Sequence, residues 1–226
     1  MWKRFWVFPA VLLCFTLSAI AADRDEDIMR IHKAADVFHE IMSTPDKGIP
    51  QDLLASAKCI AIIPVELKFA FVFGGNHGRG VAMCRKENGW SAPMFMAIDG
   101  GSVGYQIGGS STDLVLLFMN DHALQSLLSD KFKLGADASV AAGPVGRSAA
   151  ADTDLKLKAE VLSYSRSQGI FAGVSLNGSV MQADVSGDKA LYGPKATHRA
   201  ILQGEVRVPE SANLLIQELD RASRPA

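Results

Sequence analysis

The sequence lacks a surplus of charge of either sign, because 23 Lys and Arg residues stand against 24 Asp and Glu residues, for a net charge of −1. Nonspecific nucleic-acid binders depend on a basic surplus that neutralises phosphates, so nucleic acid is not an expected partner. The same balance argues against electrostatic adsorption of the whole protein to an anionic membrane. A local basic patch remains compatible with it.

Long apolar runs are also absent, apart from one at the N-terminus. No stretch after residue 21 approaches the ~20 apolar residues that span a bilayer, so we expect the remainder to be soluble. The N-terminal run, Phe5–Ile20, follows the positive charges of Lys3 and Arg4 and ends at the small-x-small pattern Ala19-Ile-Ala21. We therefore expect residues 1–21 to be a cleaved signal peptide, with an uncleaved anchor as the alternative, and the protein to be periplasmic or secreted. Cleavage would remove two of the 23 basic residues and leave 21 against 24 acidic residues, a net charge of −3.

Cysteine is scarce, with three residues in the chain. Cys14 lies in the N-terminal run and lacks the small residues that precede a lipid-modified cysteine. Cys59 and Cys84 could pair in an oxidising compartment. Both lie in apolar runs, so two buried free thiols are an equally good interpretation.

The sequence shows no metal-binding spacing and no convincing catalytic motif. The five histidines lie at separate positions without a recognised ligand pattern, namely His32, His39, His77, His122 and His198. Gly100-Gly-Ser-Val-Gly104 matches the G-x-S-x-G pattern of serine hydrolases, but the residues after it do not indicate the helix that a nucleophile elbow requires. We expect no enzyme activity, no cofactor and no metal. A hydrolase that uses Ser102 with His122 or His198 and Asp113 is the less favoured alternative.

Helical periodicity and turn signals outline the expected elements. Apolar residues recur at helical spacing over Ile28–Met42, which predicts a helix there. Shorter helices are expected from Pro50 to about Ala57, over Ala123–Leu128 and over Ser211–Leu219. Asn120 or Asp121 is the expected N-cap of the second of these. Expected strands, which are short and rich in apolar residues, are Cys59–Ile63 (stopped by Pro64), Phe69–Phe73, Val81–Arg85, Trp90–Ile98, Val103–Ile107, Leu114–Met119, Leu155–Arg166, Ile170–Leu176 and Ser179–Asp184.

Glycine-containing segments separate these strands and predict turns. Gly74-Gly-Asn-His-Gly-Arg-Gly80 is interpreted as a turn that needs the glycines Gly74, Gly75, Gly78 and Gly80. Such a turn could also form a nest of backbone N–H groups for a phosphate, with Arg79 as a charged fork. Asp99-Gly-Gly101 predicts another turn, and Asn88-Gly89 and Asn177-Gly178 predict hairpins.

The order of elements predicts one α+β domain over residues 22–226, with no internal repeat or linker. Its sheet is expected to be antiparallel and partly barrel-like, built from short strands punctuated by glycine. A pair of helices would precede the sheet, and one helix would close the chain.

Residues 49–181 resemble the SYLF family, whose members occur among bacterial exported proteins and eukaryotic membrane-trafficking proteins. The most specific matching stretches are Ser139-Val-Ala-Ala-Gly-Pro-Val-Gly-Arg147 and Tyr164-Ser-Arg-Ser-Gln-Gly-Ile-Phe-Ala-Gly-Val-Ser175. Other matching stretches, in the order that the family shows, are Ile49-Pro50, Ile60–Pro64, Phe71–Gly75, Gly78–Gly80, Trp90–Pro93, Val103–Gly108 and Thr112-Asp113.

The resemblance implies a non-catalytic module that binds phosphoinositides or other acidic lipids, and some eukaryotic members bind actin. For an exported bacterial member, acidic envelope lipids such as phosphatidylglycerol, cardiolipin or lipopolysaccharide are the expected ligands. The candidate headgroup contacts are the basic residues of the matching stretches, namely Lys58, Lys68, Arg79, Arg147 and Arg166. The alternative is an adaptor that presents its glycine-rich strands to a protein partner in the envelope.

Overall fold

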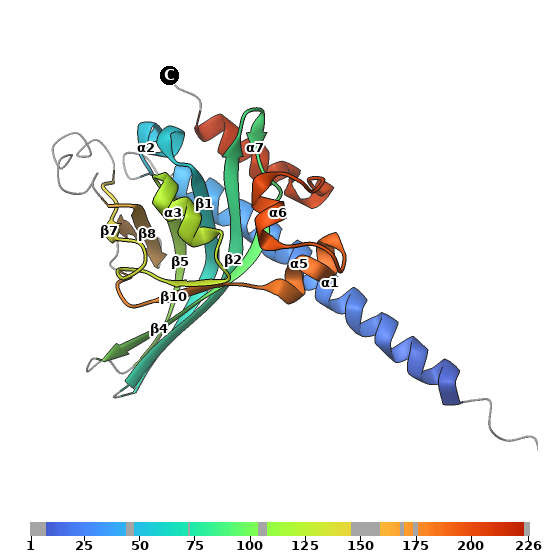
Figure 1. Cartoon of the computed structure of the whole chain (residues 1–226). Coiled ribbons are helices and arrows are strands. Elements are labelled where there is room, and N and C mark those ends of the chain that lie inside the picture. Colours follow the sequence, from blue (N-terminus) through green and yellow to red (C-terminus); the bar gives the residue numbers. More distant parts are fainter. Residues whose placement is uncertain are drawn as a thin grey trace, which may run out of the picture.

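The computed structural model describes residues 8–43, 48–71, 73–103, 108–145, 159–167, 170–173 and 176–223 (Figure 1). A strongly curved sheet lies at the centre, and helices cover parts of both of its faces. Its helices are α1 (Phe8–Met42), α2 (Gln51–Ser56), α3 (Asp121–Leu127), α5 (Val185–Tyr192), α6 (His198–Gln203), the 3-10 turn η2 (Glu210–Ala212) and α7 (Asn213–Ala222). Its strands are β1 (Cys59–Phe71), β2 (Phe73–Lys86), β3 (Gly89–Trp90), β4 (Met94–Val103), β5 (Gly108–Phe118), β6 (Lys131–Lys133), β7 (Val140–Ala142), β8 (Val161–Ser167), β9 (Ile170–Gly173) and β10 (Val180–Ala183).

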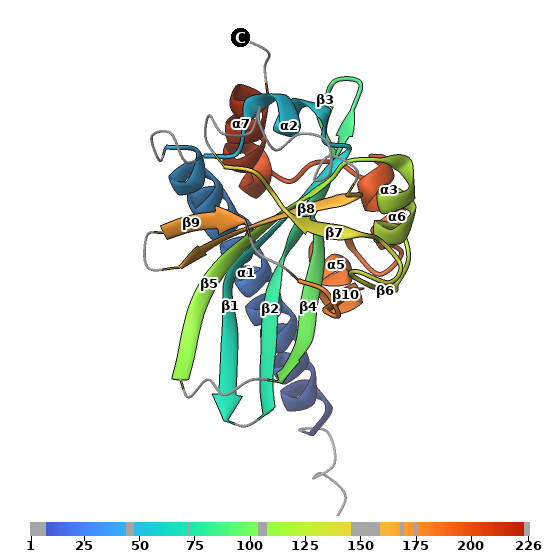
Figure 2. The same ribbon diagram turned by 90° about the vertical axis from the view of Figure 1, so that its left-hand side faces the viewer.

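The strands form one sheet in the order β6-β10-β4-β2-β1-β5-β8-β7, with β3 paired to β2 and β9 paired to β8. The predicted α+β class with a partly closed sheet is confirmed. One detail differs, because β7 and β8 pair in parallel and the sheet is therefore mixed. Figure 2 shows the four long strands β1, β2, β4 and β5 side by side, with α1 behind them and the shorter strands crossing above.

Both faces of the central strands are buried, which explains why β1 begins as an unbroken apolar run. Ile60 and Ile62 pack with residues of α1 and α7, whereas Cys59, Ala61 and Ile63 pack in a second cluster with residues of α3 and α6. Successive residues of a strand point to opposite faces, so a strand covered on both sides carries apolar residues at every position.

The two cysteines left open by the sequence form a disulfide. Cys59 and Cys84 are direct partners in the antiparallel register of β1 and β2, and their sulfur atoms lie 2.09 Å apart. The bond joins the first residue of β1 to the far end of β2, on the face of the sheet that packs with α3 and α6.

Several predicted elements are confirmed, and α1 is the one whose bounds differ most from the prediction. Helices α2 and α7 lie where expected, and Asn120 caps α3 by accepting a hydrogen bond from the Ala123 N–H at 2.8 Å. The Asn88-Gly89 turn joins β2 to β3, and Gly89 has a φ of 120°. Helix α1 begins at Phe8, twenty residues before the predicted start at Ile28. Of the predicted strand over 155–166, residues 155–158 lie outside the described residues.

Other predictions about turns were wrong. Strand β1 continues through Pro64 to Phe71, because the pairing of β1 with both neighbours shifts register between Ile62 and Leu67. A proline is tolerated in a sheet where the ladder is irregular, since no hydrogen bond from its nitrogen is required there. Asp99-Gly-Gly101 lies inside β4.

The predicted hairpin around Asn177-Gly178 was also wrong. Residues 177 and 178 form a turn, but β10 pairs with β4 and β6, whereas β9 pairs with β8. The turn therefore moves the chain from one part of the sheet to another. Helices α5 and α6 were missed altogether. Among the described residues, none of the helices has the length and apolar character needed to cross a membrane.

Candidate functional site

The basic residues singled out from the sequence do not gather into one headgroup site. Lys58 and Lys68 are ten residues apart in extended chain, so the distance between their backbone positions is about 33 Å. Lys58 pairs with Asp121 at 3.1 Å, and Lys68 lies in β1 opposite Asn76 and Ser110. Arg147 lies outside the described residues.

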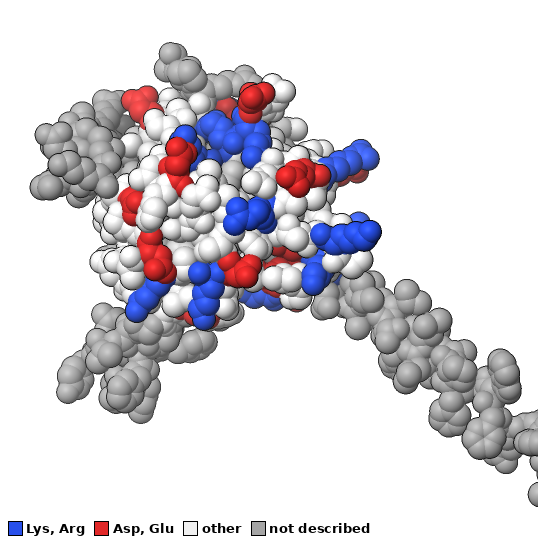
Figure 3. Space-filling model, in the orientation of Figure 1, with Lys and Arg blue, Asp and Glu red and all other residues white. Residues whose placement is uncertain are grey.

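Arg166 belongs to a separate part of the sheet. Its guanidinium donates to Asp113 Oδ2 at 2.7 Å and also pairs with Glu40 of α1. On the face shown in Figure 3, acidic side chains lie between most of the basic ones. The mixture of signs agrees with the near-zero net charge and gives no broad basic surface there.

The predicted glycine-rich turn is a strand. Gly74, Gly75, Gly78 and Gly80 all lie in β2, which is hydrogen-bonded to β1 on one side and to β4 on the other. Backbone N–H groups of a central strand are committed to its neighbours, so a phosphate-binding nest does not form here. A Cβ on Gly80 would collide with the Ile62 carbonyl oxygen, and this close approach, not a turn, requires the glycine.

Arg79 joins three elements in an ionic cluster. Its guanidinium donates to Glu26 of α1 at 2.8 Å and to Asp184 at 2.6 Å. Asp184 also accepts from Arg30 of α1 at 3.1 Å, and it caps α5 by accepting from the Gly187 N–H. Burial alone would raise the pKa of Asp184, but hydrogen bonds from Ser186, Arg79 and Gly187 hold it well below its usual value.

Beside this cluster lies a shallow pocket of about 260 Å³ between α1 and β2, hereafter the α1–β2 pocket. It is lined by Glu26, Met29, Arg30, Lys33, Pro64, His77, Gly78 and Arg79. Met29 is 54 % exposed, so an apolar side chain faces solvent at this pocket. Lys33 is exposed and forms no ion pair with another described residue, whereas His77 pairs with Asp99 at 2.7 Å.

The residues of the hydrolase alternative are not arranged as a triad in the described part of the chain. Ser102 lies within β4, opposite Gly74 of β2, and not on a strand-to-helix elbow. His122 pairs with Glu160, and His198 lies against the Leu128 carbonyl and Asp130. Asp113 binds Arg166. The described residues contain no cluster of three His, Cys, Asp or Glu placed to hold a metal ion.

The curved mixed sheet and its ionic contacts to α1 define an α+β domain whose described surface offers pockets for binding and no assembled catalytic group. A sequence model of the Ysc84 family, described as "Las17-binding protein actin regulator", matches residues 99–222. The chain therefore belongs to the Ysc84 family, whose domain is also called SYLF, and the resemblance found in the sequence is confirmed.

Curated relatives extend the similarity over most of the chain. Protein YSC84 of Saccharomyces cerevisiae is 39% identical over 179 residues, which cover 77% of this chain and 38% of that protein. LAS seventeen-binding protein 3 of the same species is 38% identical, with 77% and 39% coverage. SH3 domain-containing YSC84-like protein 1 of Homo sapiens is 35% identical over 187 residues, with 81% and 54% coverage. The chain thus spans about half or less of the length of these relatives.

Proposed function

We propose that the chain is a non-catalytic binding module that engages acidic phospholipid headgroups at the bacterial envelope through the α1–β2 pocket. The observation that carries this proposal is that exposed Met29 lines the same pocket as the basic residues Lys33 and Arg79. An exposed apolar side chain beside basic residues suits a membrane interface. The apolar side chain enters the headgroup region, and the basic side chains attract anionic lipid.

Lys33 is the main headgroup contact in this proposal. Arg79 already pairs with Glu26 and Asp184, so a phosphate would have to compete with Glu26 for it. We expect weak binding that depends on salt, since exposed charges are screened within about 8 Å at physiological ionic strength. Lys58, Lys68, Arg147 and Arg166 are proposed as peripheral contacts outside the pocket.

The proposal includes export. Residues 1–21 act as a cleaved signal peptide, and residues 22–226 form one domain in the periplasm or outside the cell. The Cys59–Cys84 disulfide supports this location, because structural disulfides persist in oxidising compartments. Expression of the full chain followed by fractionation and mass determination tests it: a periplasmic product that begins at Ala22 is expected, and an intact chain in the cytoplasm would contradict it.

Flotation with liposomes tests the lipid proposal. The purified protein is expected to float with neutral lipid that contains phosphatidylglycerol and cardiolipin, but not with neutral lipid alone, and high salt should reverse flotation. Lys33→Glu should abolish it. Lys131→Glu is the matched control, since Lys131 is an exposed lysine on β6, an end strand that β10 and β4 separate from β2 of the pocket. Salt-independent flotation with neutral lipid, or an unchanged Lys33→Glu variant, would refute this site.

A protein partner is the second candidate function. The family description and the names of the relatives refer to Las17 binding, actin regulation and SH3 domains. In this chain the corresponding proposal is an envelope protein that binds the domain surface. Absence of flotation with either liposome, together with retention of an envelope protein on the immobilised domain after cross-linking, would favour this function.

A further inference from the structure

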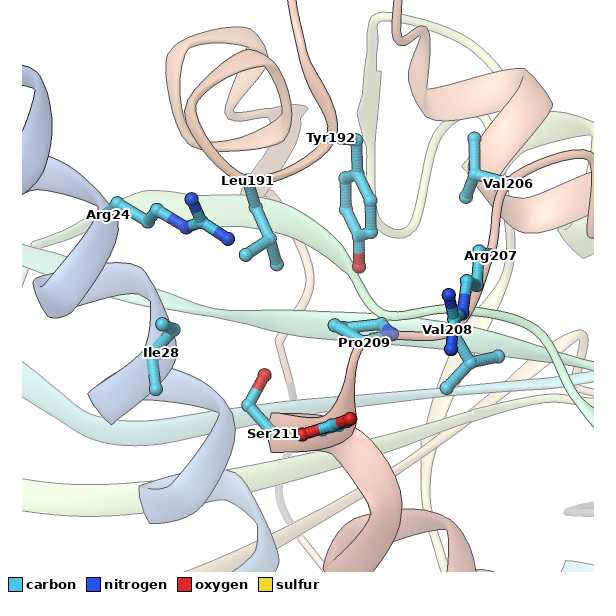
Figure 4. A pocket seen from close by; sticks show the side chains of 10 residues that line it. Arg24, Ile28, Leu191, Tyr192, Val206, Arg207, Val208, Pro209 and Ser211 are labelled. Carbon is cyan, nitrogen blue, oxygen red and sulfur yellow. The ribbon is translucent and has the colours of Figure 1, made fainter.

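A second and larger pocket lies on the other flank of α1, between α1, α5 and the segment that leads from α6 to η2. Its volume is about 510 Å³, within the range of small-molecule sites. It is lined by Arg24, Ile28, Leu191, Tyr192, Val206, Arg207, Val208, Pro209, Glu210 and Ser211 (Figure 4). We call it the α1–α5 pocket.

The two pockets are separated by the geometry of α1. At 100° per residue, Arg24 and Ile28 lie about 40° apart on the helix, whereas Lys33 lies about 180° from Arg24. A ligand in the α1–α5 pocket therefore does not touch the α1–β2 pocket, and the inference below stands or falls independently of the proposed function.

The wall of the α1–α5 pocket is largely apolar and firmly held. Leu191, Tyr192 and Val208 pack against the buried core clusters. The Tyr192 hydroxyl donates to the Pro93 carbonyl at 2.6 Å, which fixes the ring at the pocket. Burial raises the pKa of Tyr192, so the phenol remains neutral. The pocket thus offers an ordered apolar surface without a negative charge from this side chain.

Two arginines from different parts of the chain border this apolar wall. In Figure 4 the Arg24 guanidinium extends from α1 toward Leu191, and that of Arg207 lies beside Val208. Neither arginine forms an ion pair or hydrogen bond with another residue that the structure describes, although Glu210 also lines the pocket. By contrast, Arg30, Arg79 and Arg166 are all paired with carboxylates.

We propose that the α1–α5 pocket binds one single-chain amphiphile that carries an anionic oxygen head, such as a fatty-acid carboxylate or the phosphate of a lysophospholipid. The hydrocarbon chain lies against Leu191, Val206 and Val208, where burial of apolar surface contributes about 25 cal/mol per Å². The head pairs with one guanidinium, that of Arg24 or that of Arg207, which lie at opposite ends of this apolar wall (Figure 4). Guanidinium groups bind carboxylate and phosphate oxygens through paired N–H donors. The ligand is a monomer taken from solution, and no bilayer is needed.

Fluorescence titration with cis-parinaric acid, kept below its aggregation concentration, tests the proposal on the full chain. Saturable binding of one probe per protein is expected. Oleate or oleoyl lysophosphatidic acid should displace it, and oleyl alcohol should not, since it has the same chain without a charge. Displacement by oleate alone or by the lysolipid alone would identify the head, and either supports the site. Failure to saturate, or equal displacement by oleyl alcohol, would overturn the proposal.

Variants locate the site. Of Arg24→Gln and Arg207→Gln, the variant that removes the head contact should weaken probe binding about tenfold, the value of one charge-assisted hydrogen bond, and the double variant should show at least the same loss. Arg221→Gln is the control, because Arg221 is an exposed arginine on α7 that pairs with Glu218 and lines neither pocket. Ile28→Trp should block binding by filling the pocket, and it should leave the thermal midpoint nearly unchanged because Ile28 is only half-buried. Unchanged affinity in the double arginine variant or in Ile28→Trp would place the probe elsewhere and refute this site.

Discussion

The Asp188 carboxylate accepts a hydrogen bond from the Phe95 N–H at 2.8 Å and thereby fastens α5 to β4 inside the protein. The other carboxylate oxygen has no hydrogen-bond partner among the described residues. Burial, together with the nearby carboxylates Asp184 and Asp27, raises the pKa of Asp188 to about 7, although the Phe95 N–H and Arg30 act in the opposite direction. The native protein therefore holds a proton that the unfolded chain releases near pH 4.

Replacement of Asp188 by Asn should remove this pH dependence. Because the native pKa is raised, the folded state loses stability relative to the unfolded state as the pH rises from about 4 to about 7. Asp188→Asn keeps an oxygen that can accept from Phe95 and carries no charge. It should match the wild-type free energy of unfolding near pH 4 and exceed it at pH 8, by up to about 4 kcal/mol. Urea denaturation across this range measures the difference, and a constant difference at all pH values would contradict the assignment.

Asp184 should contribute more to stability than any exposed acid of the ionic cluster. Asp184→Ala removes the α5 cap and leaves Arg30, which is buried, without one of its partners. Removing one partner of a buried pair costs about 3 to 5 kcal/mol. Glu26→Ala is the comparison, since Glu26 is 59 % exposed and its loss should cost about 1 kcal/mol or less. Denaturant melts measure the free energy of unfolding of both variants. Equal losses in Asp184→Ala and Glu26→Ala would show that burial does not determine how much each carboxylate contributes to stability.

Local patterns in the sequence predicted the elements whose causes are local. The N-cap at Asn120, the Asn88-Gly89 turn and helix α7 all depend on neighbouring residues, and all are confirmed. Strand β1 continues through Pro64 because it pairs with β2 and β5 on both sides of this residue. Those partners are distant in sequence, so Pro64 alone wrongly predicted that the strand ends there. Glycine marks turns in most sequences, but Gly80 serves the close approach of two strands instead.

The candidate sites were harder to predict because their parts are distant in sequence. Arg79 meets Asp184 across 105 residues and Arg30 meets the same carboxylate across 154 residues. Basic residues could be counted in the sequence, but their carboxylate partners could not be assigned, and no local pattern distinguished Lys33, Arg24 and Arg207 from the other basic residues. Asp184 followed by Val185-Ser-Gly-Asp188 carries an N-cap signal that could have revealed α5.

The Cys59–Cys84 disulfide should account for a substantial part of the stability. It closes a loop with a sequence separation of 25, for which the loss of unfolded-state entropy corresponds to about 3.5 kcal/mol. A variant with both cysteines replaced by Ala should unfold at a lower guanidinium concentration. Reductant should lower the wild-type midpoint toward that of the variant and leave the variant unchanged. Two results together would show that the disulfide does not form. The wild-type midpoint would be the same with and without reductant, and Cys59 and Cys84 would titrate as two free thiols in the unfolded protein without reductant.

Gly80→Ala tests the close approach of β1 to β2 beside Ile62 and Ile63. The added Cβ would overlap the Ile62 carbonyl oxygen and would lie 2.7 Å from the Ile63 Cα, so one of two central strands must move. Crowding of this kind costs about 1 to 3 kcal/mol, and here the obstacle is backbone, which cannot rotate away as a side chain can. Gly48→Ala is the control, because its nearest neighbour is the Ile41 carbonyl at 3.4 Å and its φ is not positive. Thermal midpoints of the two variants give the answer: a stable Gly80→Ala protein would mean that β1 and β2 lie farther apart at this point, and that Gly80 could be replaced without moving either strand.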